Sequence, residues 1–299
     1  MLKKYAPLMI IVAGACWGAL GIFVRSLNGY GVASMEIVES RSIVATVVFG
    51  LGILCYDRRL FRIKLAHGWC FLGTGVIGIT LFNFCYFQTI KAASLSVAAV
   101  LLYTAPIFVM LFSAVLFKEV ITRRKVICLI MAFTGCMLVS GIFGAETALN
   151  SKGILIGLCA GLGYALYTVF ARYSLNYGYH PLTLQFYTFL TSLISGAFIT
   201  DFDQLGHAVS VNGFPVIGAI LCISIVSTVI PNIFYSFGMQ HVDNGKTSVM
   251  ASIEPVMAII FGMVFFSEFP TPVAVVGMLL SITAIILINT QKSQNKDEA

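Results

Sequence analysis

Residues 247–268 have the sequence TSVMASIEPVMAIIFGMVFFSE, which is long and apolar enough to cross a lipid bilayer. The stretch also contains a carboxylate, Glu254, directly before Pro255. A charged group inside hydrocarbon is costly and usually marks a functional site. A proline there removes a backbone donor and weakens the preceding turn. We therefore predict a kinked membrane helix with a functional acid near its middle.

The same pattern occurs 149 residues earlier, in AAVLLYTAPIFVMLFSAVLFKE at residues 98–119. Over residues 82–119 and 231–268, eight of 38 aligned positions are identical without a gap. The identities include both prolines, both terminal glutamates and two N-x-x-Y pairs: Pro106 with Pro255, Glu119 with Glu268, Asn83 with Asn232, and Tyr86 with Tyr235. Ala105 aligns with Glu254, so the repeated architecture does not itself require the acid.

The composition places the chain in the membrane. Hydrophobic residues make up 59% of the sequence and charged residues 10%, against roughly 25% charged residues in a soluble domain. The net charge of +6 is spread over short clusters between apolar runs, which indicates membrane topology and not nucleic-acid binding. The eight cysteines form no C-x-x-C motif and do not cluster with histidine. We expect no metal site, no cofactor and no enzymatic activity.

Ten apolar segments of roughly membrane-spanning length predict ten transmembrane helices. They lie at about 5–24, 32–56, 68–90, 94–117, 124–143, 152–173, 181–200, 213–239, 247–267 and 270–290. With the N-terminus inside, fourteen of the 18 lysines and arginines fall on the inner side, three fall outside, and Arg41 lies within a span. This bias predicts a multi-pass protein of the cell membrane with both termini in the cytoplasm.

The repeat divides the predicted all-α membrane protein into two halves of five spans, residues 1–146 and 147–292, followed by a cytoplasmic tail at 293–299. Because five is odd, the second half enters the bilayer from the opposite side. Such inverted repeats are typical of secondary transporters, whose substrate site lies near the midplane. Glycines at four-residue spacing in the first span of each half predict close helix packing, with a sliding interface as the alternative: Gly14, Gly18, Gly153, Gly157 and Gly161.

Several of these features together resemble the EamA family of the drug/metabolite transporter superfamily. They are the ten spans in two inverted halves, the Trp17-Gly18 pair, Arg41 in the second span, and the two P-x(12)-E segments. The resemblance covers nearly the whole chain. It implies a central cavity built from the first four spans of each half. It also implies transport of small metabolites such as amino acids, amines, nucleosides or carboxylates.

Glu254 and Arg41 are the leading candidates for substrate binding or coupling. Glu254 would pair with a cationic substrate group or carry a proton, and its alternative is a structural ion pair with Arg41. Arg41 would hold a substrate carboxylate, or pair with Glu254, Glu36 or Glu39. Continuous helical spacing would put Thr247, Met250 and Glu254 on one face with Ser252 beside it.

The remaining candidates are polar or aromatic residues of the predicted cavity helices. They are Asn83, Tyr86, Asn232, Tyr235, Tyr103, Ser252, Trp17 and Tyr164, with Pro106 and Pro255 as helix kinks. For the two Asn/Tyr pairs, hydrogen bonding between helices is the alternative to lining the cavity. Glu119 and Glu268, at opposite ends of the bundle, are expected to cap helices or contact gate loops.

Taken together, the sequence predicts a secondary transporter of small metabolites, with amino acids or related amines and carboxylates leading and export as the direction. It would act as a monomer or homodimer by alternating access around a midplane cavity. Proton coupling through Glu254 and facilitated diffusion both stay open. The chain has no G-x-x-x-x-G-K-[ST] motif, so ATP does not drive it directly. The alternatives are a channel-like permease and, less favoured, a membrane enzyme acting on lipids.

Overall fold

The computed structural model describes residues 2–142 and 151–290. Within these ranges the regular elements are all helices, joined by short connections, and there are no strands. The predicted boundary between the halves at residues 146 and 147, and the predicted tail at 293–299, lie outside the described residues. The first range contains α1 (Leu2–Gly18), α2 (Leu20–Gly29), α3 (Ser34–Tyr56), η1 (Arg58–Phe61), η2 (Leu65–His67), α4 (Gly68–Leu72), η3 (Gly73–Leu81), α5 (Phe82–Ala92), α6 (Leu95–Leu102), α7 (Ala105–Phe117) and α8 (Arg123–Val139). The second contains α9 (Ser151–Asn176), α10 (Pro181–Gly196), α11 (Phe202–Asn212), α12 (Phe214–Ser224), η5 (Ile225–Val229), α13 (Ile230–Met239), α14 (Asn244–Ala251), α15 (Glu254–Phe266) and α16 (Pro272–Asn289).

Eight helical segments are long and apolar enough to cross a membrane, so the chain is a multi-pass membrane protein. They are Lys3–Gly29, Ser34–Tyr56, Leu65–Ala92, Leu95–Phe117, Ser151–Asn176, Phe214–Met239, Asn244–Phe266 and Pro272–Asn289. The other two predicted spans coincide with α8 and α10, which are 17 and 16 residues long. α11 lies in a stretch that the sequence predicts as a connection, and most of its residues are exposed.

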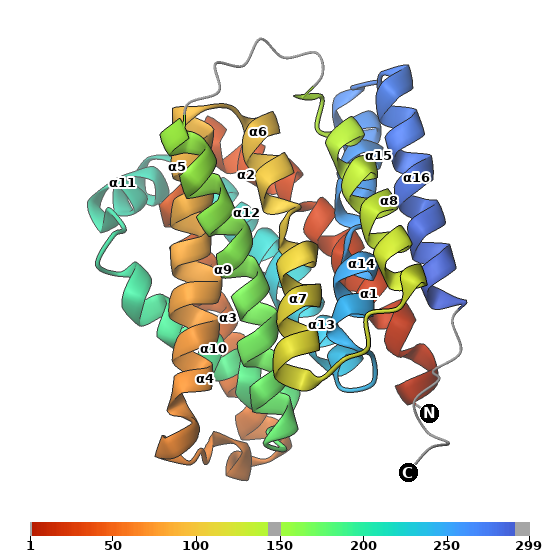
Figure 1. Cartoon of the computed structure of the whole chain (residues 1–299). Helices are drawn as coiled ribbons and strands as arrows, with labels where there is room; N and C mark the ends of the chain where they lie inside the picture. The colour runs from red at the N-terminus through yellow and green to blue at the C-terminus, as the bar shows by residue number, and fades with distance from the viewer. Residues whose placement is uncertain (1, 143–150, 291–299) are drawn as a thin grey trace.

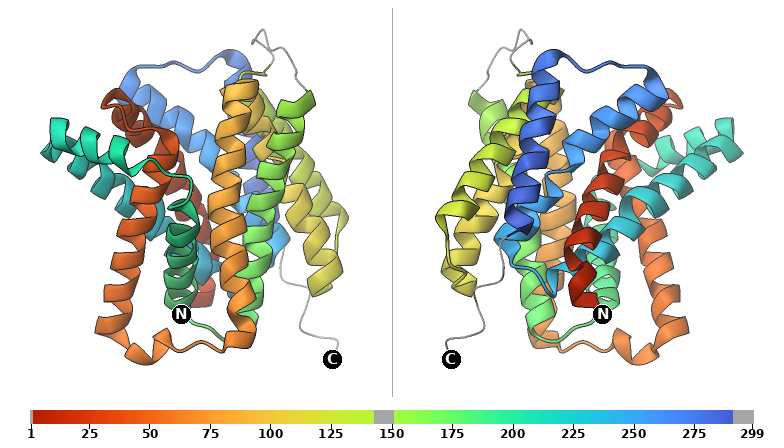
Figure 2. Two further views of the ribbon diagram at one scale, coloured as in Figure 1. Left: turned by 90° about the vertical axis from the view of Figure 1, so that its left-hand side faces the viewer. Right: turned by 90° about the vertical axis from the view of Figure 1, so that its right-hand side faces the viewer.

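The helices run between two ends of different character (Figure 1). α1 begins at the end where the connections at 57–67, 118–122, 177–180 and 240–243 lie. We call it the basic end, because Lys3, Lys4 and the arginines of η1 are exposed there. At the opposite end lie the connections at 30–33, 93–94 and 267–271, and there α11 and α12 lean away from the other helices (Figure 2). α8 packs along α16 at one edge of the molecule, and α3 packs along α10.

Two long spans are interrupted at matching positions. α6 ends before Tyr103 and Thr104, and α14 ends before Ser252 and Ile253, 149 residues later. Pro106 and Pro255 then lie in the first turn of the next helix, where a missing N–H costs nothing. The residues between the paired helices keep nearly helical backbone angles, so each interruption is a short turn within one span. That the prolines kink these spans, and that Thr247, Met250 and Glu254 share one face, stay predictions.

Two π-helical segments also match across the repeat. η5 (Ile225–Val229) lies 149 residues after positions within η3 (Gly73–Leu81). In each, an asparagine amide donates to the carbonyl four residues earlier: Asn83 Nδ2 to Ile79 O and Asn232 Nδ2 to Thr228 O, both at 2.8 Å. A π-segment displaces backbone hydrogen bonds from their α-helical partners, and such segments are frequent at functional sites.

Glycines of α1 and α9 contact the two broken spans directly. A Cβ atom at Gly18 would lie 2.7 Å from the carbonyl oxygen of Glu254, and one at Gly14 would lie 3.0 Å from that of Ala251. A Cβ atom at Gly161 would lie 2.7 Å from the carbonyl oxygen of Leu101. The structure thus confirms that the glycine stripes allow close backbone approach. Each stripe packs against the broken span that belongs to the other part of the repeat.

We expect Gly18→Ala to lower the free energy of unfolding by about 1–3 kcal/mol, because the new methyl group overlaps main-chain atoms that cannot move independently. Gly21→Ala in α2 is the matched control, since a Cβ atom there meets nothing within 4 Å. Thermal unfolding of both variants in the same detergent measures the difference. Equal midpoints for the two variants would contradict the close approach.

Candidate functional site

Glu254 is the first residue of α15 and lies at the break between α14 and α15. Protein surrounds its side chain on all sides, yet part of its surface stays accessible to solvent. A deep side chain that keeps accessible surface can be reached by water. The break places a carboxylate there while the main chain on either side stays helical.

Besides the buried thiol of Cys136 in α8, four predicted site residues lie close enough to Glu254 to interact with its charge: Arg41 of α3, Tyr86 of α5, Tyr103 at the α6–α7 turn, and Tyr164 of α9. All four are deep in the bundle and keep accessible surface, as Glu254 does. Five predicted site residues from five separate segments therefore converge on one centre. We call these five residues the central site.

Arg41 and Glu254 face the same space without touching. Three ion pairs within 4 Å are present among residues 2–142 and 151–290, and none of them joins these two residues. Arg41 Nε instead donates a hydrogen bond of 2.7 Å to Thr228 Oγ1 in the π-segment η5. Opposite charges that are held apart can each accept a group of opposite sign from a ligand.

The two Asn/Tyr pairs lie in different surroundings. Asn232 and Tyr235 are buried, whereas Asn83 and Tyr86 are partly exposed. Asn232 Oδ1 accepts from the Tyr167 hydroxyl at 3.2 Å. The network continues from Gln185 Nε2, which donates to the Tyr167 hydroxyl at 3.0 Å and to Ser236 Oγ at 2.5 Å. The predicted hydrogen bonding between helices is thus present in one pair only.

Besides Asn83, Asn232 and Tyr235, two more predicted residues are not part of the central site. The Trp17 ring packs on Tyr235, with ring centroids 5.2 Å apart, and so belongs to the buried side of the bundle. Ser252 is buried, and its hydroxyl donates to the Ser248 carbonyl at 3.2 Å, which leaves it facing its own chain.

The basic end is closed by a cluster around Glu119. Its Oε1 atom accepts from the Asn244 backbone N–H at 2.9 Å, and Oε2 accepts from that of Gly245 at 3.3 Å. The carboxylate therefore caps α14, where the helix dipole favours negative charge. Arg172 donates to Asn244 Oδ1 at 2.6 Å and to the carbonyl oxygens of Met239 and Val242. Lys125 lies 3.4 Å from Asp243 and 4.0 Å from Glu119, and only 6% of its side chain is exposed.

The matching residues at the opposite end do not close it. Glu268 corresponds to Glu119, and Arg25 corresponds to Arg172. Here they pair with each other at 2.6 Å, and their side chains are 60% (Arg25) and 58% (Glu268) exposed. Leu95, which corresponds to the buried Asn244, is 62% exposed. The bundle is thus sealed between Glu119 and α14 at the basic end, and the equivalent contact at the other end is open.

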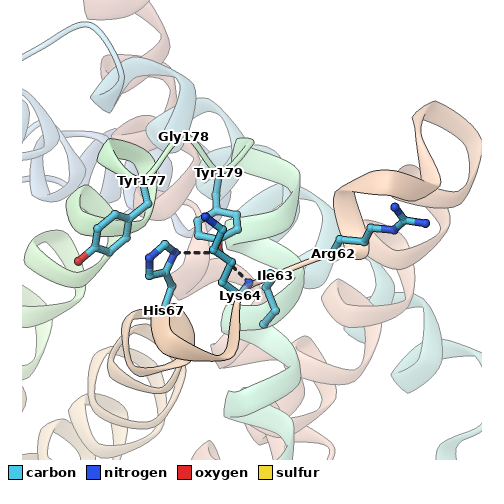
Figure 3. Close-up of a pocket in the computed structure, with 7 residues that line it drawn as sticks. All are labelled: Arg62, Ile63, Lys64, His67, Tyr177, Gly178 and Tyr179. Atoms are coloured by element: carbon cyan, nitrogen blue, oxygen red, sulfur yellow. Dashed lines mark hydrogen bonds between the residues drawn. The ribbon is translucent and has the colours of Figure 1, made fainter.

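Two surface cavities lie at the basic end. One, of about 280 Å³, adjoins the closure and is lined by Glu119, Arg172 and Asp243 among others. The other, of about 310 Å³, lies between the 62–67 connection and the α9–α10 turn (Figure 3). There His67 stacks on Tyr177 and bonds the Tyr179 hydroxyl at 3.0 Å, while Arg62 points away. None of the residues that line these two cavities belongs to the central site. At the second cavity, the contacts of His67 with Tyr177 and Tyr179 hold the two connections together.

Three residues that bond the predicted site residues, directly or through one another, were not identified from the sequence. Thr228, which orients Arg41, belongs to a run of small and β-branched residues that does not differ from an ordinary apolar span. Gln185 and Tyr167 are polar residues of apolar spans that a search for buried amides and phenols would find. Within residues 2–142 and 151–290, no three His, Cys, Asp or Glu side chains gather as metal ligands.

The chain is similar to known proteins over nearly its whole length. The sequence profile of the EamA-like transporter family matches residues 4–141 and again residues 151–290. An uncharacterized transporter of Archaeoglobus fulgidus is 24% identical, with 95% of this chain and 96% of that protein covered. The uncharacterized transporter YxxF of Bacillus subtilis is 24% identical, with 98% and 93% covered. A solved crystal structure superposes with a TM-score of 0.78 at 18% identity, covering 95% of this chain and 96% of the other. The chain belongs to the EamA-like transporter family.

Proposed function

We propose that the protein is a secondary transporter of small metabolites that carry both charges, with amino acids and related compounds as the leading class. The observation that carries the proposal is the central site, where Arg41 and Glu254 face one accessible space without pairing. Arg41 would hold the carboxylate of the substrate and Glu254 its ammonium group. The three tyrosines supply apolar faces with polar hydroxyls around the same space.

The proposed mechanism is alternating access between two inverted five-helix repeats, residues 1–146 and 147–292. Four matched pairs of features support it: the broken spans, the π-segments, the glycine stripes, and the left-handed residues Lys118 and Ser267 at the ends of α7 and α15. Under this proposal α8 and α10 also cross the membrane, which raises the number of spans from eight to ten. Rocking of the repeats would open the basic end as the opposite end closes.

The opposite end would close by a copy of the contacts now made at the basic end. Glu268 would cap α6 at Leu95 and Ser96, the counterparts of Asn244 and Gly245. Arg25 would donate to the carbonyl oxygens of Ile90 and Ala93, the counterparts of Met239 and Val242. The exposed Arg25–Glu268 pair contributes little by itself, so it can exchange partners at low cost.

The excess of basic residues favours a cytoplasmic basic end in the cell membrane, with the N-terminus inside. The described state would then face outward, and export is the proposed direction. Binding from the inside would require the Glu119 cluster to separate first.

Counterflow in proteoliposomes tests the function, because exchange needs no driving gradient. Vesicles are loaded in turn with unlabelled amino acids, amines, carboxylates and nucleosides, and entry of the labelled compound is followed. We expect saturable exchange of a zwitterionic compound. Flux that grows linearly with concentration would favour a channel-like permease, and no exchange across the panel would overturn the substrate class.

A further inference from the structure

A second acidic site lies beside the central site, on the first two turns of α3. Glu36 and Glu39 are three residues apart and so share one face of this helix. Their side chains are 5% and 1% exposed, respectively. Glu36 Oε2 and Glu39 Oε1 are buried without a hydrogen-bond partner. Pairing of Arg41 with one of these acids was among the alternatives that the sequence left open, and Arg41 bonds Thr228 instead.

Gly196 of α10 makes room for one of the two carboxyl groups. A Cβ atom built at Gly196 would lie 2.1 Å from Glu39 Oε2, so any other residue would displace the carboxyl group. One turn further along, Ser42 and Ser192 hydroxyls lie 3.2 Å apart, and Thr80 lies 3.2 Å from Ser192 and 2.7 Å from Ser195. The Glu39 carboxyl group therefore lies at the interface of α3 and α10, where the hydroxyls of Ser42, Ser192, Ser195 and Thr80 are close by.

No cation balances these acids in the part of the chain that the structure describes. The ion pairs there involve Glu119, Asp243 and Glu268. The elements that pack on α3 are α2, α5, α10, α12, η1 and η5, and η5 has no titratable side chain. The cations of the other elements lie elsewhere: Arg25 pairs with Glu268, Lys91 is exposed, and Arg58 and Arg59 are at the basic end. Their remaining titratable side chains are neutral groups, namely Cys85, Tyr86, the exposed Cys222, and Tyr187, which bonds the Phe61 carbonyl.

Burying carboxylates without a counter-charge is too costly to persist, so a small cation must neutralise them. We propose that Glu39, with Glu36 one turn before it, forms a proton-binding site that couples transport to the pH gradient, an inference that rests on the proposed transporter function. The site lies near the end that is open in this structure. Arg41 of the central site lies two residues after Glu39 on the same helix, α3. If protonation of Glu39 changes how α3 packs, Arg41 therefore moves with it.

Proton binding can be measured without any substrate. Infrared difference spectra of the purified protein between about pH 5 and about pH 9 report protonated carboxyl groups. We expect a titrating carboxyl band in wild type that Glu39→Gln weakens, and any contribution of Glu254 is identified by its loss in Glu254→Gln. Glu268→Gln is the matched control, because that carboxylate is exposed and already paired. Spectra of wild type and Glu39→Gln that titrate identically would overturn the proposal.

Two further measurements complete the test. The first distinguishes binding of a proton from binding of a metal cation. The second distinguishes failure of this proposal from failure of the proposed transporter function. If sodium or potassium at constant ionic strength shifts the thermal midpoint of wild type, but not of Glu39→Gln, the site binds an alkali cation and the proton is excluded. With a compound that wild type exchanges, Glu39→Gln should keep counterflow but lose the accumulation of about tenfold per pH unit that one coupled proton provides. If wild type exchanges no compound, the transporter function fails while the titration result stands.

Discussion

Glutamine in place of Glu254 is expected to reduce counterflow of a zwitterionic substrate by roughly 30-fold or more. The change keeps the shape of the side chain but removes the only negative charge at the central site that faces Arg41. Truncating one member of a buried charged pair costs about 2–5 kcal/mol, because the other charge loses its compensation. The loss should appear mainly as weaker substrate binding, since the hydrogen bonds that hold α14 and α15 do not use the Glu254 side chain.

Asp203→Asn is the control for this experiment, since it removes one carboxylate from exposed α11, far from the central site. Variant folding is checked by size-exclusion elution and thermal midpoint. If Glu254→Gln exchanges substrate as well as wild type but no longer concentrates it under a pH gradient, Glu254 carries the proton. That outcome would contradict its assignment as a substrate ligand.

Replacing Glu119 with glutamine is expected to open the basic end. Glutamine keeps one acceptor oxygen but loses the charge that caps α14 and attracts Lys125. A hydrogen bond to a charged group contributes about 1.5–3 kcal/mol, so losing its charge should shift the closed-to-open equilibrium about tenfold or more. Spin labels at Ile121 and Gln240, both exposed on either side of the closure, report the separation. We expect the population with the longer distance to grow in the variant.

Glu268→Gln provides the internal comparison, because it is the same substitution at the matching position of the repeat. Its partner Arg25 is exposed, and exposed ion pairs contribute roughly 0–1 kcal/mol. The distance distribution at the basic end should stay as in wild type. Identical distributions in wild type and Glu119→Gln would show that the capping contact does not hold this end closed.

These two results bear on different parts of the proposal. A defect in Glu254→Gln concerns what the central site binds, whereas a change in Glu119→Gln concerns which side it faces. Because a ligand shifts a conformational equilibrium only by its differential affinity, a substrate that binds both states equally would leave the label distances unchanged.

Much of the fold follows from the sequence alone. Apolar segments of membrane-spanning length locate the helices, because lipid demands about 20 apolar residues for each crossing. The 149-residue offset identifies the matching prolines, glutamates and N-x-x-Y pairs before any coordinates are seen. The glycine stripes on α1 and α9 predict close packing, since only glycine lets two helix backbones touch.

The remaining features depend on contacts between residues far apart in the chain. Helical spacing does not reveal the short turn at Ser252 and Ile253, after which Pro255 lies in the first turn of a new helix. Glu119 and Glu268 occupy the same position in the repeat, yet one is a buried cap and the other an exposed ion pair. A local sequence cannot determine which of two matching ends is closed, since that difference is a property of the conformational state. The sequence by itself located eight membrane-spanning segments, the 149-residue sequence repeat and the unusual acid. The tertiary structure decided which charges meet, because burial and partner distance set the energy of a charge.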